Sequence, residues 1–204
     1  VEYNTSTNPT FEGAVRDTSG RGLDGVFYGG ASYDANEKAL KFSTGNDYVN
    51  TNIQSSLPTN GNFIHSMSMW FNPDSLTAGS GDAIVFIGGL TGSSNYKVEL
   101  FMETDRINYT FGNSSFQAYP TITNGRWYHL GLTYNGVGGQ SGRAIYLDGV
   151  QITATHSADS GVLNLPNGNL DLGRYTPDGT ATTSAFDGSI SQFKLYDTAL
   201  TAEE

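Results

Sequence analysis

The sequence predicts an all-β protein, an antiparallel two-sheet β-sandwich with a short C-terminal helix. Short apolar runs alternate with clusters of Gly, Asn, Asp and Ser from Ala39 to Tyr196, which is the spacing of strands and turns in a sandwich. Glycine is abundant (26 residues) and aromatic residues reach 12%, whereas charged residues make up only 15%. This composition is rich in strand and turn formers and poor in the residues typical of helical proteins.

Several segments have the length and composition of strands. They are Ala39–Phe42, Phe63–Phe71, Ala83–Ile87, Tyr96–Met102, Arg106–Phe111, Arg126–Tyr134, Arg143–Leu147, Val150–Thr155, Leu170–Gly173 and Ser189–Tyr196. Between two of them, Asp148-Gly149 predicts a two-residue type I′ hairpin, because both turn residues of that hairpin need φ > 0.

Period-two alternation separates a core face from a mixed face, because successive side chains of a strand point to opposite sides of the sheet. In Ser66–Asn72 the methionines lie on the apolar face and Trp70 lies on the mixed one. In Trp127–Tyr134 the mixed face carries Trp127 and His129. Strands that bury one face and expose the other are typical of antiparallel sheets.

The C-terminal part of the chain combines a strand with the start of a helix. Simple alternation in Ser189–Tyr196 places Ser191, Phe193 and Leu195 on one face. Thr201–Glu204 has the spacing of a capping box, with a threonine at the N-cap and a glutamate three residues later. This spacing predicts that a helix begins there.

Length and charge narrow the class of protein. A chain of 204 residues fits one β domain spanning residues 1–204. The formal net charge is −10 and the basic residues are scattered, which argues against nucleic acid as a partner. No apolar run approaches the roughly 20 residues that span a bilayer, so we expect no membrane insertion. Cysteine is absent, which excludes disulfides. Because the chain begins at Val1, we expect it to be part of a longer protein.

An ordered set of motifs carries a family resemblance. The motifs are Asp17–Gly20, the glycine-spaced Arg21–Gly25, Ala39–Phe42, Gly45–Val49, Ser66–Pro73, Arg126–Asn135, Ala144–Val150 and Phe186–Glu204. Their order resembles that of a laminin-G-like jelly roll, a member of the concanavalin A-like lectin/glucanase superfamily. The resemblance covers nearly the whole chain. It implies two antiparallel sheets, one of them concave, in a domain that often binds glycans or proteins as an accessory module.

The resemblance also implies a structural calcium ion between the Asp-x-Ser-Gly loop and the last strand. The matching positions are Asp17, Gly22, Asp24, Ser191 and Gln192. Ca²⁺ prefers six to eight oxygen ligands, including carboxylates and carbonyls. The last-strand ligand of the family is usually an acid, so this chain has lost charge there. Either neutral oxygens bind the ion more weakly, or a neighbouring aspartate compensates. The alternative is that Asp17 caps an Asx-turn.

Aromatic side chains on the mixed faces suggest a platform for carbohydrate. Sugars stack their C–H faces on aromatic rings, while their hydroxyls bond amides and carboxylates. The candidate ligand-binding residues are Trp70, Tyr109, Trp127 and His129. The alternative is that these rings pack under loops or against a neighbouring subunit, since aromatic residues are also enriched at protein interfaces.

Catalysis is not predicted. A retaining glycosidase needs two carboxyl groups about 5–5.5 Å apart. Glu99 and Glu103 lie four residues apart on one predicted strand, which separates them by about 13 Å. The histidines show no zinc-binding spacing. The sequence therefore predicts a protein that is not an enzyme and has no catalytic residues.

The leading prediction is a carbohydrate-binding or adhesion module of a cell-surface, secreted or virion surface protein. Its partner would be a glycan or a surface polysaccharide. The second is a structural decoration or assembly domain that binds protein neighbours in a larger assembly. A glycoside hydrolase or lyase is the third. Fold-level analogy alone does not establish function.

Overall fold

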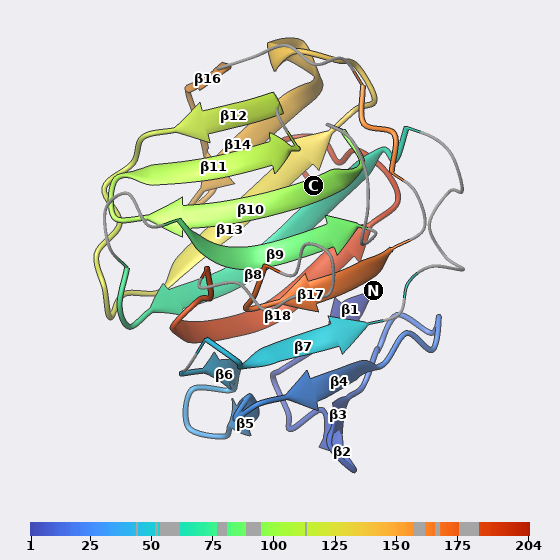
Figure 1. Cartoon of the computed structure of the whole chain (residues 1–204), viewed down its shortest axis with the longest axis vertical. Helices are drawn as coiled ribbons and strands as arrows, with labels where there is room; N and C mark the ends of the chain where they lie inside the picture. Colours follow the sequence, from blue (N-terminus) through green and yellow to red (C-terminus); the bar gives the residue numbers. More distant parts are fainter. Residues whose placement is uncertain are drawn as a thin grey trace.

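Two antiparallel sheets packed face to face form the protein (Figure 1). The computed structural model describes residues 1–43, 45–51, 53, 62–76, 81–88, 95–112, 114–156, 162–165, 168–175 and 184–204. Within these residues helical structure is limited to a 3₁₀ turn, η1 (Gln140–Gly142). No helix among them is long and apolar enough to span a bilayer.

Sheet A contains the strands that carry the motifs of the C-terminal half. Its order is β15 (Val150–Ile152), β14 (Arg143–Leu147), β13 (Tyr128–Tyr134), β8 (His65–Pro73), β18 (Gly188–Tyr196), β6 (Ala39–Phe42) and β5 (Ser32–Asp34), and β1 (Glu2–Tyr3) pairs with β18 off this path.

Sheet B forms the second layer, which lies in front in Figure 1. Its order is β16 (Ala154–His156), β12 (Ser114–Ala118), β11 (Arg106–Phe111), β10 (Lys97–Glu103), β9 (Asp82–Gly88), β17 (Asn169–Leu172), β7 (Tyr48–Thr51), β4 (Gly25–Tyr28), β3 (Ala14–Val15) and β2 (Thr10–Phe11). The predicted all-β sandwich is therefore confirmed.

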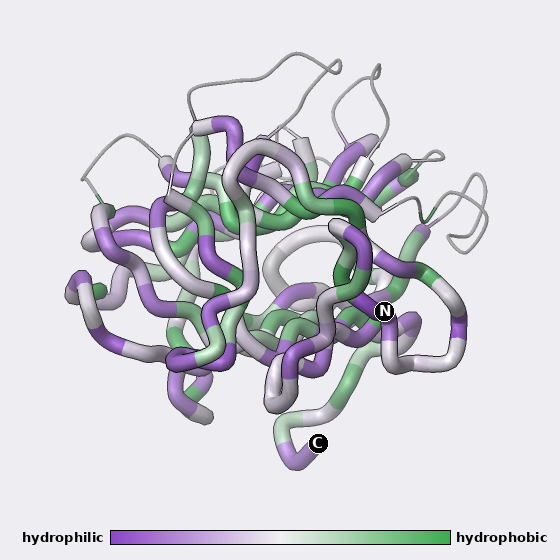
Figure 2. The backbone as a smooth tube through the Cα atoms, turned by 90° about the horizontal axis from the view of Figure 1, so that it is seen from below, coloured by the Kyte–Doolittle hydropathy of each residue, from purple (hydrophilic) through white to green (hydrophobic). Residues whose placement is uncertain are grey.

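The core lies between the inner faces of the two sheets. Sheet A contributes Met67, Met69 and Leu130 to it, and sheet B contributes Val98 and Leu100; all are buried. Burial of a large apolar side chain stabilises a fold by about 1.5–3 kcal/mol. Figure 2 shows hydrophobic and hydrophilic residues alternating along the backbone, with the C-terminal end of the chain on the outside of the fold.

The hairpin between β14 and β15 has the predicted geometry. Asp148 has a φ of 51° and Gly149 a φ of 79°, the left-handed values that a type I′ turn requires at both positions. Asp148 Oδ1 also accepts a hydrogen bond from the His129 backbone N–H at 2.9 Å. The turn is thereby tied to β13.

Strand β18 contains a bulge that the sequence pattern did not predict. Its register against β8 shifts after Ser191, and Gln192 adopts a φ of 52°. Because the extra residue resets the alternation, Ile190 and Phe193 are both buried. Ser191 instead pairs with Trp70 and lies on the outer face of sheet A. The prediction that Ser191 shares a face with Phe193 is wrong.

The predicted C-terminal helix is also wrong, because Thr201–Glu204 forms a turn. Glu204 Oε2 accepts hydrogen bonds from the backbone N–H (2.9 Å) and the hydroxyl (3.1 Å) of Thr201, so the capping contact forms. The Glu204 N–H reaches the Thr201 carbonyl at 3.4 Å, a contact between residues three apart. The described residues of this segment therefore make the capping contact within a turn and include no α-helix.

Candidate functional site

Trp70 lies in the middle of the outer face of sheet A. Its side chain is 44% exposed, which is unusual for the largest apolar residue. His129 is its cross-strand partner on β13, and the two ring centroids are 5.2 Å apart. Ser191 flanks Trp70 on β18. The strands thus place an exposed indole between an imidazole and a hydroxyl.

A groove of about 340 Å³ opens beside Trp70. We call it the Trp70 groove, and its lining residues are Ser6, Glu37, Lys38, Trp70, Trp127, Ser191 and Gln192. It is built by the loop after β1, by the turn between β5 and β6, and by strands β8 and β18 together with Trp127, which directly precedes β13. Both tryptophans of the sequence therefore line one surface.

Hydrogen bonds hold the β18 side of the groove in place. The Ser191 hydroxyl donates to the Lys38 carbonyl at 3.0 Å and lies 2.6 Å from the Thr5 hydroxyl. The backbone N–H of Gln192 donates to the Thr5 hydroxyl at 3.1 Å, and its side-chain amide donates to Asn4 Oδ1 at 3.1 Å. The bulge in β18 is thus fixed against the N-terminal loop, which gives the groove a preformed wall.

Polar groups surround the two indoles. Glu37 is exposed and its Oε2 accepts a hydrogen bond from the Ser189 hydroxyl at 2.5 Å. Asn72, the cross-strand partner of Ser189, is only 7% exposed. In the part of the chain that the structure describes, Asn72 Oδ1 has no hydrogen-bond partner. Buried polar atoms normally have one, but Asn72 does not line the groove.

A second hollow, of about 310 Å³, lies on the other side of His129. We call it the Gly131 pocket. Strands β8, β13 and β14 form its floor, and the residues that line it from the strands are Ser66, Met67, Ser68, His129, Gly131, Leu132, Thr133 and Tyr146, with Gly149 from the hairpin. Leu200–Glu204 forms its wall.

The C-terminal segment, residues 197–204, is held on the sheet by a buried serine. The Ser66 hydroxyl donates to the Thr198 carbonyl at 2.9 Å and accepts from the Leu200 N–H at 2.8 Å. On the pocket floor, His129 Nε2 lies 3.0 Å from the Ser68 hydroxyl. Burial lowers the pKa of His129, although the Asp148 carboxylate opposes this. The imidazole is therefore neutral at pH 7.

Tyr109 does not belong to this surface. It lies on the inner face of β11 with no exposed area, and its ring packs edge-on against Phe111 at 5.2 Å. Its hydroxyl donates to His65 Nε2 at 2.5 Å. The structure therefore brings together Trp70, Trp127 and His129 but places Tyr109 in the core.

The predicted calcium ligands lie in two separate hydrogen-bond networks. Asp17 Oδ1 accepts from the N–H groups of Glu2 (2.9 Å) and Ser19 (3.0 Å). Asp17 Oδ2 accepts from the Ser19 hydroxyl (2.8 Å) and the Leu23 N–H (3.1 Å). Asp24 Oδ1 accepts from the Asp17 N–H at 2.7 Å.

The residues predicted to bind calcium are poorly arranged to bind the ion. A carboxylate that already accepts four hydrogen bonds has little capacity left for a cation, and Gly22 lies in the same loop with an exposed, left-handed backbone. Ser191 and Gln192 bond instead to Asn4, Thr5 and Lys38, as described above. Among the described residues, no group of three or more His, Cys, Asp or Glu side chains is placed to hold a metal. Calcium binding stays a prediction.

Replacing Asp17 with asparagine tests the two interpretations. Burial opposes ionisation of Asp17, but the hydrogen bonds from Glu2, Ser19 and Leu23 outweigh it and hold the pKa of Asp17 below its usual range. We expect Asp17→Asn to lower the free energy of unfolding by about 1 kcal/mol at pH 7, because one acceptor oxygen becomes a donor. The stabilisation by the carboxylate is present above its unfolded pKa and is lost as pH falls through its folded pKa.

Thermal melting with and without EDTA is the measurement. If Asp17 only organises the loop, EDTA leaves the melting temperature of the wild type unchanged and Asp17→Asn lowers it equally in both buffers. A calcium ion would instead make the wild type EDTA-sensitive and the variant insensitive, since a ligand stabilises the state that binds it.

The glutamates considered for catalysis lie away from the Trp70 groove, on the outer face of sheet B. Glu99 Oε1 is 2.8 Å from Lys97 Nζ, and Glu103 forms an ion pair with Arg106. Each carboxylate is thus paired with a cation.

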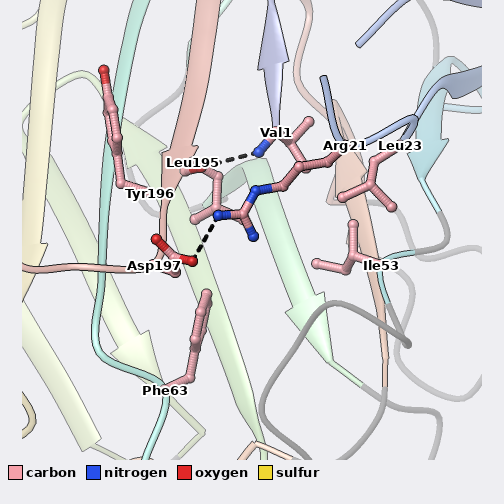
Figure 3. A pocket seen from close by; sticks show the side chains of 8 residues that line it. All are labelled: Val1, Arg21, Leu23, Ile53, Phe63, Leu195, Tyr196 and Asp197. Atoms are coloured by element: carbon pink, nitrogen blue, oxygen red, sulfur yellow. Dashed lines mark hydrogen bonds and ion pairs between the residues drawn. The ribbon is translucent and has the colours of Figure 1, made fainter. Parts of the chain in front are cut away.

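A small cavity of about 30 Å³ lies where β1 meets the end of β18 (Figure 3). The backbone nitrogen of Val1 donates to the Leu195 carbonyl at 3.1 Å, and Arg21 pairs with Asp197 at 2.8 Å. Apolar side chains, including Ile53 and Phe63, complete its lining. Its size suits packing between the loops rather than a ligand.

Comparison with known proteins places this geometry in context. A family model described as "Concanavalin A-like lectin/glucanases superfamily" matches residues 43–204. A search of curated proteins finds no significant match. Many solved structures share the fold.

Domain 4 of an extracellular arabinanase from Geobacillus stearothermophilus, in complex with arabinotriose, has a TM-score of 0.67 and 17% identity, covering 99% of this chain and 93% of that chain. The CBM40 domain of the Ruminococcus gnavus IT-sialidase, bound to α2,3-sialyllactose, has a TM-score of 0.61 and 13% identity, covering 81% and 92%. A Trypanosoma rangeli sialidase has a TM-score of 0.69 and 17% identity, covering 100% of this chain but only 31% of the sialidase chain. At these identities the likeness concerns the fold.

Proposed function

Because this chain belongs to the concanavalin A-like lectin/glucanases superfamily, we propose that it is a non-catalytic carbohydrate-binding module of a cell-surface, secreted or virion surface protein. Its binding site is the Trp70 groove. The observation that carries the proposal is the exposed Trp70 indole, flanked by Trp127 and by the polar groups of Glu37 and Gln192.

The chemistry of the groove suits a sugar. An aromatic face carries negative charge and attracts the weakly positive C–H groups of a sugar ring. The Glu37 carboxylate can accept hydrogen bonds from sugar hydroxyls, and the Gln192 amide can both donate and accept them. A pocket that combines apolar area with a few fixed polar groups is the usual form of a small-molecule site.

The fold neighbours support this proposal. One is a domain in complex with arabinotriose and another is a domain bound to α2,3-sialyllactose. Both are matched over more than nine tenths of their length. Some other neighbours are sialidases of which this chain matches less than a third, and the ion-paired carboxylates on sheet B favour binding over hydrolysis.

A glycan array that carries neutral and sialylated oligosaccharides tests the proposal. We expect the wild-type protein to bind at least one group of related glycans. No binding to any glycan, together with self-association in sedimentation velocity, would contradict it. That outcome would favour the alternative, a structural decoration or assembly domain whose exposed aromatic face meets protein neighbours.

A further inference from the structure

The Trp70 groove and the Gly131 pocket adjoin each other on the outer face of sheet A. Trp70 lines the groove and His129 lines the pocket. These two residues are cross-strand partners whose rings are 5.2 Å apart. Ser68, two residues before Trp70 on the same face, also lines the pocket. The two hollows thus share the Trp70–His129 pair as a common border.

The floor of the Gly131 pocket is open because Gly131 has no side chain. Its cross-strand partners are Ser68 on one side and Tyr146 on the other. A Cβ atom added at Gly131 would meet Tyr146 Cβ at 3.5 Å, an ordinary contact, and its φ is not in the left-handed region. Neither the backbone nor the packing demands a glycine here. Because Gly131 has no side chain, space remains beside His129.

Hydroxyls, an imidazole and carboxylates line this space. Ser68, Thr133 and Tyr146 supply hydroxyls from the sheet, and Glu203 and Glu204 face them from the C-terminal segment. In the Trp70 groove the charged groups are Glu37 and Lys38. Among the described residues that line the two hollows, Lys38 is the only cation and no arginine is present.

This charge pattern disfavours an acidic sugar. Recognition of a carboxylate or sulfate group usually relies on arginine, which offers two parallel N–H donors. Like charges brought together at a binding site weaken the complex, and this protein carries a net charge of −10. A neutral sugar with many hydroxyls has no such penalty and can bond to each of the polar groups named above.

We propose that the two hollows form one continuous site for an extended neutral oligosaccharide. One sugar residue stacks on Trp70 in the groove, and the next residue of the same glycan occupies the Gly131 pocket beside His129. This inference rests on the proposed carbohydrate-binding function. It adds the class of ligand and the number of sugar residues that the site holds.

Calorimetric titration with ligands of increasing length tests the inference. The probes are cello-, xylo-, malto- and arabino-oligosaccharides of one to six residues, and α2,3-sialyllactose. The wild type is expected to bind one neutral series with an affinity that rises roughly tenfold or more from the monosaccharide to the disaccharide, which fills both positions. Gly131→Val, which fills the pocket floor, is expected to remove that rise and to leave binding of the shortest bound member unchanged.

Two further variants complete the design. Ser115→Val makes a similar change on β12 of the other sheet and should keep the wild-type length dependence. Thr133→Leu narrows the same pocket from the next outward position on β13 and should reproduce the effect of Gly131→Val, which covers the case in which that variant is unstable.

The outcomes separate the inference from the proposed function. Neutral-glycan binding that does not depend on length, or that Gly131→Val and Thr133→Leu leave unchanged, overturns the two-position site but not the carbohydrate-binding function. Stronger binding to sialyllactose than to every neutral series overturns the neutral class. Loss of the length dependence in both pocket variants, with the control intact, supports the inference. Absence of binding to every probe overturns the two-position site for these neutral glycans, and the glycan array then decides whether the carbohydrate-binding function stands.

Discussion

Replacing Trp70 with alanine is expected to lower the affinity for the bound glycan about 30-fold while leaving the fold intact. Removal of a central aromatic anchor typically costs a binding site about 2 kcal/mol, and each 1.4 kcal/mol is a factor of ten in affinity. The fold should tolerate the change, because the side chain is 44% exposed and lies outside the core. Substitutions at exposed positions usually change stability by no more than about 0.5 kcal/mol.

The measurement is isothermal titration calorimetry on the wild type and Trp70→Ala, with a thermal melt of each. Tyr119→Ala is a matched control, since Tyr119 is an aromatic residue with 60% exposure that follows β12 of the other sheet. The control should bind like the wild type. Equal affinities for all three proteins would show that the glycan binds elsewhere, and a large drop in the melting temperature of Trp70→Ala would show that Trp70 is structural.

Acidification from pH 7.5 to pH 5 is expected to lower the free energy of unfolding by about 2 kcal/mol through His65. His65 has no exposed area and is surrounded by the rings of Phe63, Tyr109, Phe111 and Tyr134. Burial keeps the ring neutral, and its Nδ1–H donates to the Phe63 carbonyl at 2.8 Å, so its Nε2 accepts a hydrogen bond from the Tyr109 hydroxyl.

The direction of this effect follows from the lowered pKa. Burial lowers the pKa of His65 to about 4, although the hydrogen bond to Phe63 opposes this. The unfolded chain takes up a proton near pH 6.5, whereas the folded chain does so only near pH 4. The neutral His65 ring therefore makes its full contribution to the free energy of unfolding above about pH 6.5, and this contribution is lost as pH falls toward 4. Asp17 has a lowered pKa, so it loses its contribution only below this range.

Urea unfolding at pH 7.5 and pH 5, for the wild type and for His65→Asn, measures the effect. Asparagine can still donate to the Phe63 carbonyl but does not titrate. The variant is less stable at both pH values, so the comparison concerns the difference between them. That difference should shrink by most of the 2 kcal/mol. If it does not shrink, another group, such as His129, carries the pH dependence.

The fold was largely predictable because strands such as β13, in which buried and partly exposed residues alternate along the whole length, show the period of a sheet in the sequence. Strands β6, β11 and β14 begin and end at the predicted residues, and the family resemblance is confirmed. Strands of two or three residues, such as β1 and β2, are too short to show any period. They form because longer strands provide their hydrogen-bond partners. This pairing depends on tertiary structure and cannot be read from the local sequence.

The aromatic part of the site was predictable for the same reason. Alternation in β8 and β13 assigns Trp70 and His129 to the face opposite the buried methionines. Tyr109 could have been excluded, because it alternates in phase with Ile107 and Phe111, which are plainly apolar. Glu37 and Lys38 could not have been found, since they reach the groove through a turn about thirty residues away from Trp70 in the sequence.

Two features depend on the three-dimensional packing alone. The bulge at Gln192 changes which side chains of β18 reach the surface, and no residue type marks it in the sequence. Arg143 begins β14 but turns into the core, where it donates to the carbonyls of Tyr109 and Ser114 at 3.1 and 2.9 Å. A buried arginine needs such partners, and the sequence pattern does not reveal them.

Tryptophan fluorescence tests the central claim most directly, because both tryptophans of the chain line the Trp70 groove. The neutral oligosaccharide that binds most tightly in calorimetry is titrated into the wild type and into Trp127→Phe, in which Trp70 is the only tryptophan. We expect a saturable change in tryptophan emission and less quenching by iodide in both proteins, at the affinity measured by calorimetry. Saturable binding by calorimetry with unchanged emission and unchanged quenching of Trp70 would contradict the central claim.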